Sequence, residues 1–181
     1  GLVGRNINDI YNSYSTGSVN GTTDVGGLVG YNGGTVSNSY WDTETSGQLV
    51  GIGSGLITGA TGRTSAEMMS MASFTGFNIA DTGGAGMIWR IYEGYTTPWL
   101  TYFLTPLTVT ANADSKTYDG LVYSGGNGVT YSVASPTLSG VLAYSGTSQG
   151  AINAAGGYVI TPGGYYSNQQ GYDISYADGS L

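Results

Sequence analysis

The chain has 181 residues with 33 glycines, no cysteine, no histidine and a formal net charge of −7. Its four basic residues are scattered, which argues against nucleic acids and membranes as partners, and no apolar run is long enough to span a bilayer. The missing Cys and His exclude disulfides, thiolate nucleophiles and the usual zinc sites, so we expect no cofactor and no metal.

The first forty or so residues contain a repeat. Gly1-Leu2-Val3-Gly4-Arg5-Asn6 recurs as Gly27-Leu28-Val29-Gly30-Tyr31-Asn32, and the same offset of 26 residues carries Tyr14 onto Tyr40. The apolar residues form short bursts between Gly and Asn, a spacing that predicts strands and not a helix. Such a unit cannot bury an apolar face alone, so we predict that the copies of residues 1–48 stack as β-solenoid rungs. The alternative is an antiparallel sandwich of similar hairpins.

Residues 49–106 lack the repeat and are predicted to close the stack. Thr64-Ser65-Ala66-Glu67 is a capping box, which predicts one short helix. An aromatic-rich stretch follows, from Phe74 to Trp99. Bulky side chains of this kind suit the open end of a solenoid, where the last rung otherwise exposes its core.

Residues 107–181 are predicted to form a separate small all-β module. Apolar and polar residues alternate at 107–111 and again at 172–176, as they do in half-buried strands. Further strands are expected around 129–133, 141–144 and 158–161. The whole chain is therefore predicted to be all-β.

Two parts of the sequence resemble known families. The Gly-Leu-Val-Gly-x-Asn motif, with Asn-Ser-Tyr at 12–14 and 38–40, resembles the GLUG repeat of bacterial surface proteins. Lys116-Thr117-Tyr118-Asp119-Gly120 and the closing residues 172–181 resemble a YDG or MBG-type module. The resemblance implies a right-handed β-helix, then a small β-sandwich or β-grasp-like module. It also implies a place in exoproteins similar to filamentous haemagglutinins, many of them exported by two-partner secretion, and it implies no catalytic residues.

Few residues are candidates for chemistry or binding. Asp42 and Glu44 are two apart, so they could share a strand face as paired carboxylates, but a solvated turn is the expected alternative. Exposed aromatic rings can stack on sugars. The candidates for a glycan or receptor surface are Trp41, Tyr95, Trp99, Tyr165 and Tyr166. The alternative is that these rings seal the cap and the core of the second module.

These observations lead to one main hypothesis: a structural or adhesive segment, not an enzyme, at the bacterial cell surface or outside the cell. Its expected partners are neighbouring repeats and modules of the same long chain, with a glycan or matrix receptor as a further partner. We expect both ends of the chain to continue into such modules. The alternatives are a fibre subunit that self-associates through its terminal rung, and a fragment of a carbohydrate-active β-helix enzyme.

Overall fold

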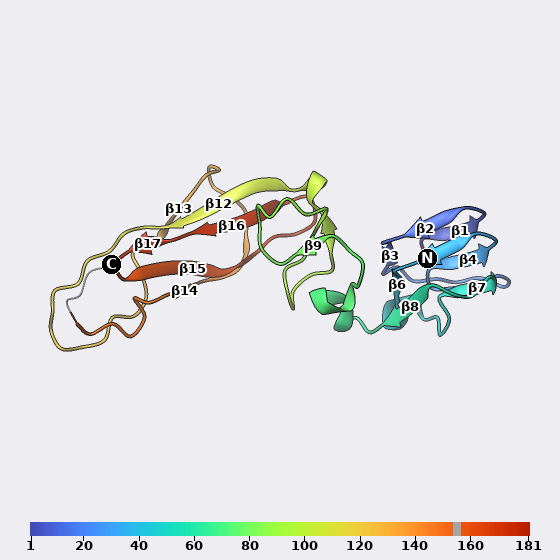
Figure 1. The fold of residues 1–181 in the computed structure, drawn as a ribbon, viewed down its shortest axis with the longest axis horizontal. Helices are drawn as coiled ribbons and strands as arrows, with labels where there is room; N and C mark the ends of the chain where they lie inside the picture. Colours follow the sequence, from blue (N-terminus) through green and yellow to red (C-terminus); the bar gives the residue numbers. More distant parts are fainter. Residues whose placement is uncertain (154–156) are drawn as a thin grey trace. The chain divides into compact units, whose positions relative to one another are not determined.

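The computed structural model describes residues 1–153 and 157–181, and it is all-β apart from short helical turns. The chain forms two compact units (Figure 1). Unit 1 contains residues 1–79 and 93–98, and unit 2 contains residues 80–92 and 99–181. The segment 49–106 is therefore divided between the two units.

Unit 1 is built from parallel strands that pair copy on copy. Its sheets have the orders β1-β4-β7, β2-β5 and β3-β6-β8. Val3 is the partner of Val29, and Tyr14 is the partner of Tyr40. This register confirms the 26-residue offset and rules out hairpins within each copy. The strands are β1 (Val3–Asn6), β2 (Asp9–Tyr11), β3 (Tyr14–Ser15), β4 (Val29–Asn32), β5 (Thr35–Ser37), β6 (Ser39–Asp42), β7 (Ile52–Gly55) and β8 (Ala60–Arg63).

The repeated asparagines before the third strand of each copy have a backbone role. Asn12 has a φ of 47° and Asn38 a φ of 44°. This left-handed conformation is unfavourable for most side chains, and Asn is one of the few residues that adopts it readily. The two residues turn the chain into β3 and β6 in the same way, so the repeated Asn encodes a repeated corner.

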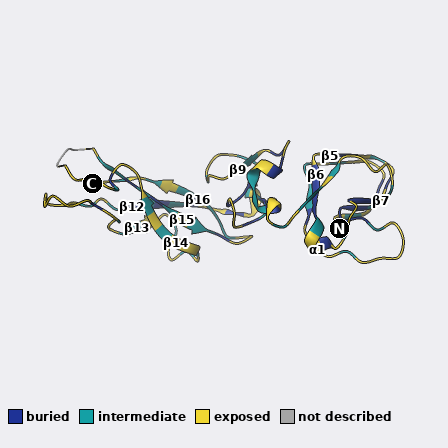
Figure 2. Cartoon of the chain, turned by 90° about the horizontal axis from the view of Figure 1, so that it is seen from below, coloured by how far each residue is buried: buried dark blue, intermediate teal, exposed yellow. Residues whose placement is uncertain are grey.

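The core of unit 1 lies between the parallel sheets. Leu28 and Val29 are fully buried, and β6 is buried along its whole length (Figure 2). Trp41 is 7% exposed, and a Cβ added at Gly27 would lie 2.2 Å from its indole ring. The first glycine of the motif therefore leaves space for a tryptophan of the same unit.

Residues 52–63 supply a third set of parallel strands that the sequence did not reveal. Val29 pairs with Ile52 and Tyr40 pairs with Thr61. The offset from Val29 to Ile52 is 23 residues and no longer 26, and Val-Gly-Ile-Gly at 50–53 lies opposite Gly-Leu-Val-Gly at 27–30. These strands therefore do not follow the 26-residue period of the first two copies.

The helical elements also differ from the prediction. The capping box forms, because Thr64 N donates to Glu67 Oε2 at 2.8 Å and Glu67 N donates to Thr64 Oγ1 at 3.2 Å. It is followed by two 3₁₀ turns, η1 (Glu67–Met69) and η2 (Met71–Ser73), because Ser70 is extended and interrupts the helix. A single α-helical turn, α1 (Thr43–Ser46), occurs where the sequence suggested a solvated turn or paired carboxylates.

The described residues of unit 2 form the sheets β13-β12-β16 and β14-β15-β17 and most of a third sheet, β11-β10-β9, whose strand β9 begins at the last residue of unit 1. β12 and β16 pair in parallel, with Leu107 opposite Ile174, and both residues are buried in the core. The five predicted strand positions are confirmed. The elements are β9 (Ile79–Ala80), β10 (Trp89–Arg90), β11 (Trp99–Leu100), η3 (Thr101–Phe103), β12 (Thr105–Ala111), β13 (Val129–Tyr131), β14 (Ser139–Ser145), β15 (Val159–Tyr166), β16 (Tyr172–Ala177) and β17 (Gly179–Ser180).

A buried arginine joins two parts of unit 2. Arg90 is 3% exposed, and its Nε lies 3.2 Å from Asp173 Oδ1. Its guanidinium also lies over the ring of Tyr92, 4.0 Å from the centroid, and donates to the carbonyl of Ile91. Burial is the largest influence on the Tyr92 hydroxyl and raises its pKa, so this ring remains neutral beside the cation.

Candidate functional site

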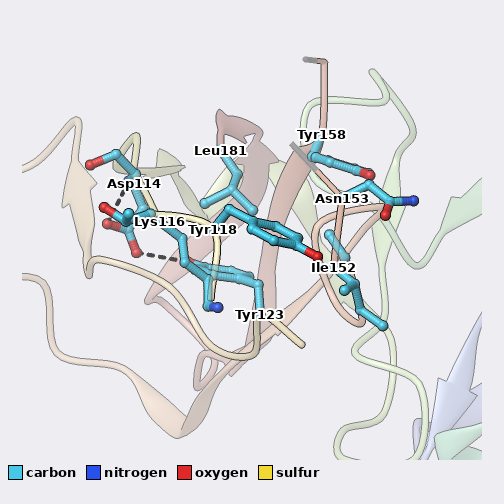
Figure 3. A pocket seen from close by; sticks show the side chains of 11 residues that line it. Asp114, Lys116, Tyr118, Tyr123, Ile152, Asn153, Tyr158 and Leu181 are labelled. Carbon is cyan, nitrogen blue, oxygen red and sulfur yellow. Dashed lines mark hydrogen bonds between the residues drawn. The ribbon is translucent and has the colours of Figure 1, made fainter. Parts of the chain in front are cut away.

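The candidate site is a pocket of about 200 Å³ in unit 2, between the segment that follows β12 and the chain end after β17 (Figure 3). Figure 3 shows the ring of Tyr118 pointing from the 114–118 segment toward Ile152 and Asn153. The lining residues are Asp114, Ser115, Lys116, Thr117, Tyr118, Tyr123, Ala151, Ile152, Asn153, Tyr158 and Leu181.

Backbone hydrogen bonds bring these separate segments together. Asp114 N donates to Ser180 O at 2.9 Å, and Leu181 N donates to Tyr158 O at 3.0 Å. Tyr123 and Ala151 are joined in the same way, at 2.8 Å. The pocket therefore rests on strand-like pairing between segments.

A tyrosine and an aspartate form the buried polar side of the pocket. Tyr123 is 7% exposed, and its hydroxyl donates to Asp114 Oδ2 at 2.8 Å. Burial and the neighbouring Asp114 carboxylate raise the pKa of Tyr123 to about 12. Because the phenol stays protonated at neutral pH, it acts as a permanent donor to Asp114.

The single lysine of the chain is already paired at the pocket. Lys116 Nζ contacts Asp119 Oδ1 and also donates to the carbonyl of Leu121 at 3.1 Å. The hydrogen bond from Lys116 is the main reason why the pKa of Asp119 is lowered. Asp119 Oδ1 also accepts from Leu121 N at 2.9 Å, which holds the Asp119-Gly120 turn in shape. The positive charge of Lys116 is thus paired with the negative charge of Asp119 within the same motif.

The pocket also has neutral hydrogen-bonding groups that are without a partner in the described part of the chain. Tyr118 is 66% exposed, and within residues 1–153 and 157–181 its hydroxyl, the Tyr158 hydroxyl and the Asn153 amide form no hydrogen bond. Two aromatic rings and three polar groups can therefore meet a ligand. The arrangement suits binding by stacking and neutral hydrogen bonds.

The five residues predicted to bind ligands lie elsewhere, two in unit 1 and three in unit 2. Trp41 is buried, and its Nε1 donates to Gln48 O at 3.1 Å. Tyr95 is 62% exposed, whereas Trp99 packs edge-on against Tyr92. In unit 2 the remaining two, Tyr165 and Tyr166, are half-buried against the core.

Tyr165 has hydroxyl partners on two sides. Its own hydroxyl accepts from Tyr131 at 3.2 Å, and its backbone N–H donates to the Tyr176 hydroxyl at 2.9 Å. The bond with Tyr131, followed by burial, raises the pKa of Tyr165 to about 12. These hydrogen bonds hold the Tyr165 ring in place within unit 2.

The pocket was missed because its residues are far apart in the chain. Lys116 to Gly120 drew attention only as a family motif, while Asn153 and Tyr158 carry no signal of their own. The motif at 116–120 supplies one side of the pocket, whereas Asn153 and Tyr158 reach the other side only through the packing of the folded chain.

The acidic pair Asp42 and Glu44 serves local structure. Asp42 is 2% exposed and caps α1, accepting from the backbone N–H groups of Glu44 and Thr45 at 2.9 and 3.0 Å. Ser65 donates its hydroxyl to Asp42 and its N–H to Glu44, each at 2.7 Å. In the described part of the chain, no three acidic side chains are grouped so that they could hold a metal ion. The helices found there are too short to cross a membrane.

Two proteins of other organisms share similarity with part of the chain. Halomucin of Haloquadratum walsbyi is 50% identical over 54 residues, which is 30% of this chain and 1% of Halomucin. A putative Gly-rich membrane protein of Evansella cellulosilytica is 43% identical over 56 residues, covering 26% of this chain and 6% of that protein. The chain thus spans only a small fraction of the length of either relative. No family model and no solved structure matches the chain.

Proposed function

We propose that the chain is a structural and adhesive segment of a large secreted or surface-anchored bacterial protein, with no catalytic role of its own. In this proposal residues 1–48 are turns of a right-handed β-helix of the GLUG type, which act as a rigid spacer. Residues 107–181 are a YDG or MBG-type module with a β-sandwich or β-grasp-like fold. Adhesion is the binding of glycans or matrix components outside the cell.

One observation carries the spacer role: hydrogen bonds of the repeated asparagine join the first copy to the second, and the second copy to the backbone of the next set of strands. Asn6 Nδ2 donates to Asn32 Oδ1 at 2.7 Å, and Asn32 Nδ2 donates to Leu56 O at 2.8 Å. A ladder of this kind extends by adding further copies, each of which needs only its neighbours. Length is then a property that such a protein can vary through its number of repeats.

The location outside the cell is supported by composition and by the relatives. The chain has no cysteine and only 8% charged residues, and its stability rests on backbone pairing and a small core. One relative is named a membrane protein, and this chain corresponds to a small part of each relative. These features suit a repeated segment of a long envelope protein.

The spacer role can be tested by lengthening the stack. Four extra copies of residues 1–26 are inserted before Gly27, and small-angle scattering gives the maximum dimension. Stacked parallel rungs add about 4.8 Å each, so unit 1 is expected to lengthen by about 20 Å along its stacking direction. The matched control inserts the same residues in scrambled order, which leaves a disordered loop. An insert that unfolds like the scrambled control would contradict the proposal.

A further inference from the structure

The unit 2 pocket has properties that decide which class of ligand it can take. Its volume of about 200 Å³ is below the ~300–1,000 Å³ typical of sites for drug-sized molecules. A ligand that fills it is therefore about one ring in size. An extended oligosaccharide or peptide could place only one unit in it.

The charges around the pocket argue against an ionic ligand. Lys116 is paired with Asp119, and Asp114 accepts hydrogen bonds from Tyr123 and Ser115. A carboxylate or phosphate ligand would have to displace Asp119 from Lys116, in a chain whose net charge is already −7. A cationic ligand would compete with the protonated Tyr123 hydroxyl for Asp114. A neutral ligand avoids both costs.

The remaining groups match the two faces of a sugar ring. Tyr118 offers an exposed aromatic face, on which the C–H groups of a pyranose can pack, and Ile152, 46% exposed, extends the apolar wall. Asn153 offers both donors and an acceptor, and the Tyr118 and Tyr158 hydroxyls each offer one donor with acceptor capacity. These are the partners that vicinal hydroxyl groups require.

We propose that this pocket binds a single neutral pyranose unit, free or at the end of a glycan. Tyr118 stacks on the ring, and Asn153 and Tyr158 hydrogen-bond its hydroxyls. The proposal rests on the adhesive role proposed above, to which it gives a location and a ligand class. A single ring on a shallow site is expected to bind with a dissociation constant on the order of 1 mM.

Saturation-transfer NMR on the full chain tests the proposal. The probes are glucose, galactose, mannose and N-acetylglucosamine, with glucuronate as the charged counterpart and a proline tripeptide as an alternative ring ligand. At least one neutral sugar is expected to show saturation of its ring C–H protons, with a signal above that of glucuronate. Binding of glucuronate or the proline peptide alone would overturn the proposal, as would the absence of any sugar signal at tens of millimolar.

Variants locate the site. Tyr118→Ala is expected to weaken binding by about tenfold or more, and Tyr158→Phe, which keeps the ring, by about threefold to fivefold. Tyr102→Ala is the matched control, because Tyr102 is a 90% exposed tyrosine of unit 2 outside the pocket. Its binding should equal that of the wild type. Loss of binding in Tyr102→Ala, or full binding in Tyr118→Ala, would place the sugar elsewhere and overturn the assignment. The scattering experiment on inserted rungs does not depend on this result, so the spacer role can fail or stand separately.

Discussion

Replacement of Asn32 by alanine is expected to destabilise unit 1 by about 2–4 kcal/mol. Asn32 is 1% exposed, and its side chain makes three hydrogen bonds: from Asn6 at 2.7 Å, to Leu56 O at 2.8 Å and from Gly34 N at 3.2 Å. Each such bond contributes about 0.5–1.5 kcal/mol net, and buried partners that stay unpaired add to the loss. Asn32→Asp should cost still more, because a carboxylate oxygen would then face the Leu56 carbonyl.

Urea unfolding measures this loss, with Trp41 as the fluorescent probe in a Trp89→Phe, Trp99→Phe background, so that only unit 1 is observed. Asn8→Ala is the matched control, since Asn8 is exposed and, among the described residues, its hydrogen bonds are made by backbone atoms. For a unit of this size the thermal midpoint of Asn32→Ala should also fall, by about 8–30 °C. If Asn32→Ala and Asn8→Ala have free energies of unfolding within about 0.5 kcal/mol of each other, the ladder does not stabilise the stack as argued.

Three further changes test other contacts. Gly51→Ala should lower the free energy of unfolding in urea by about 1–3 kcal/mol, because its Cβ would lie 2.4 Å from the Trp41 ring. This loss should be smaller in a Trp41→Leu background, and an equal loss in both backgrounds would contradict this packing. Asp42→Ala should cost about 1–2 kcal/mol at pH 7 through the lost cap. Burial alone would raise the pKa of Asp42, but hydrogen bonds hold this pKa below its usual value. The stabilisation by Asp42 is therefore complete above the unfolded pKa of about 3.9 and is lost as pH falls through the lower folded pKa. The difference in free energy of unfolding between wild type and Asp42→Ala should narrow toward pH 2, and a constant difference would refute this linkage. Asp173→Ala should lower the stability of unit 2 by about 3 kcal/mol in calorimetry, since it leaves the buried Arg90 guanidinium without its carboxylate; unchanged stability would show that the pair contributes little.

The candidate site depends more on tertiary structure than the strands do. The sequence left open whether Trp41 offers a ligand surface or fills the core, and in the structure its ring is buried against Gly27, Gly51 and Gly62. Aromatic residues look alike in a sequence whether they face solvent or the core. The pocket, in contrast, needs Tyr118 and Tyr158 from segments forty residues apart, and only chain pairing brings these together.

The sequence by itself determined the parallel register of the first two copies and the positions of the main strands of unit 2. A repeat at constant offset places identical residues in identical backbone environments, as Asn12 and Asn38 show, and alternation at 107–111 directly reports one buried face. Only the tertiary structure decided the pairing of Ile52–Gly55 with β4 and the ion pair of Arg90 with Asp173. The strand at Ile52–Gly55 forms because β4 offers an edge with which it can pair. The ion pair forms because Arg90 and Asp173 are brought together in the interior of unit 2. Neither condition leaves a periodic trace in the chain, because both arise from contacts between segments.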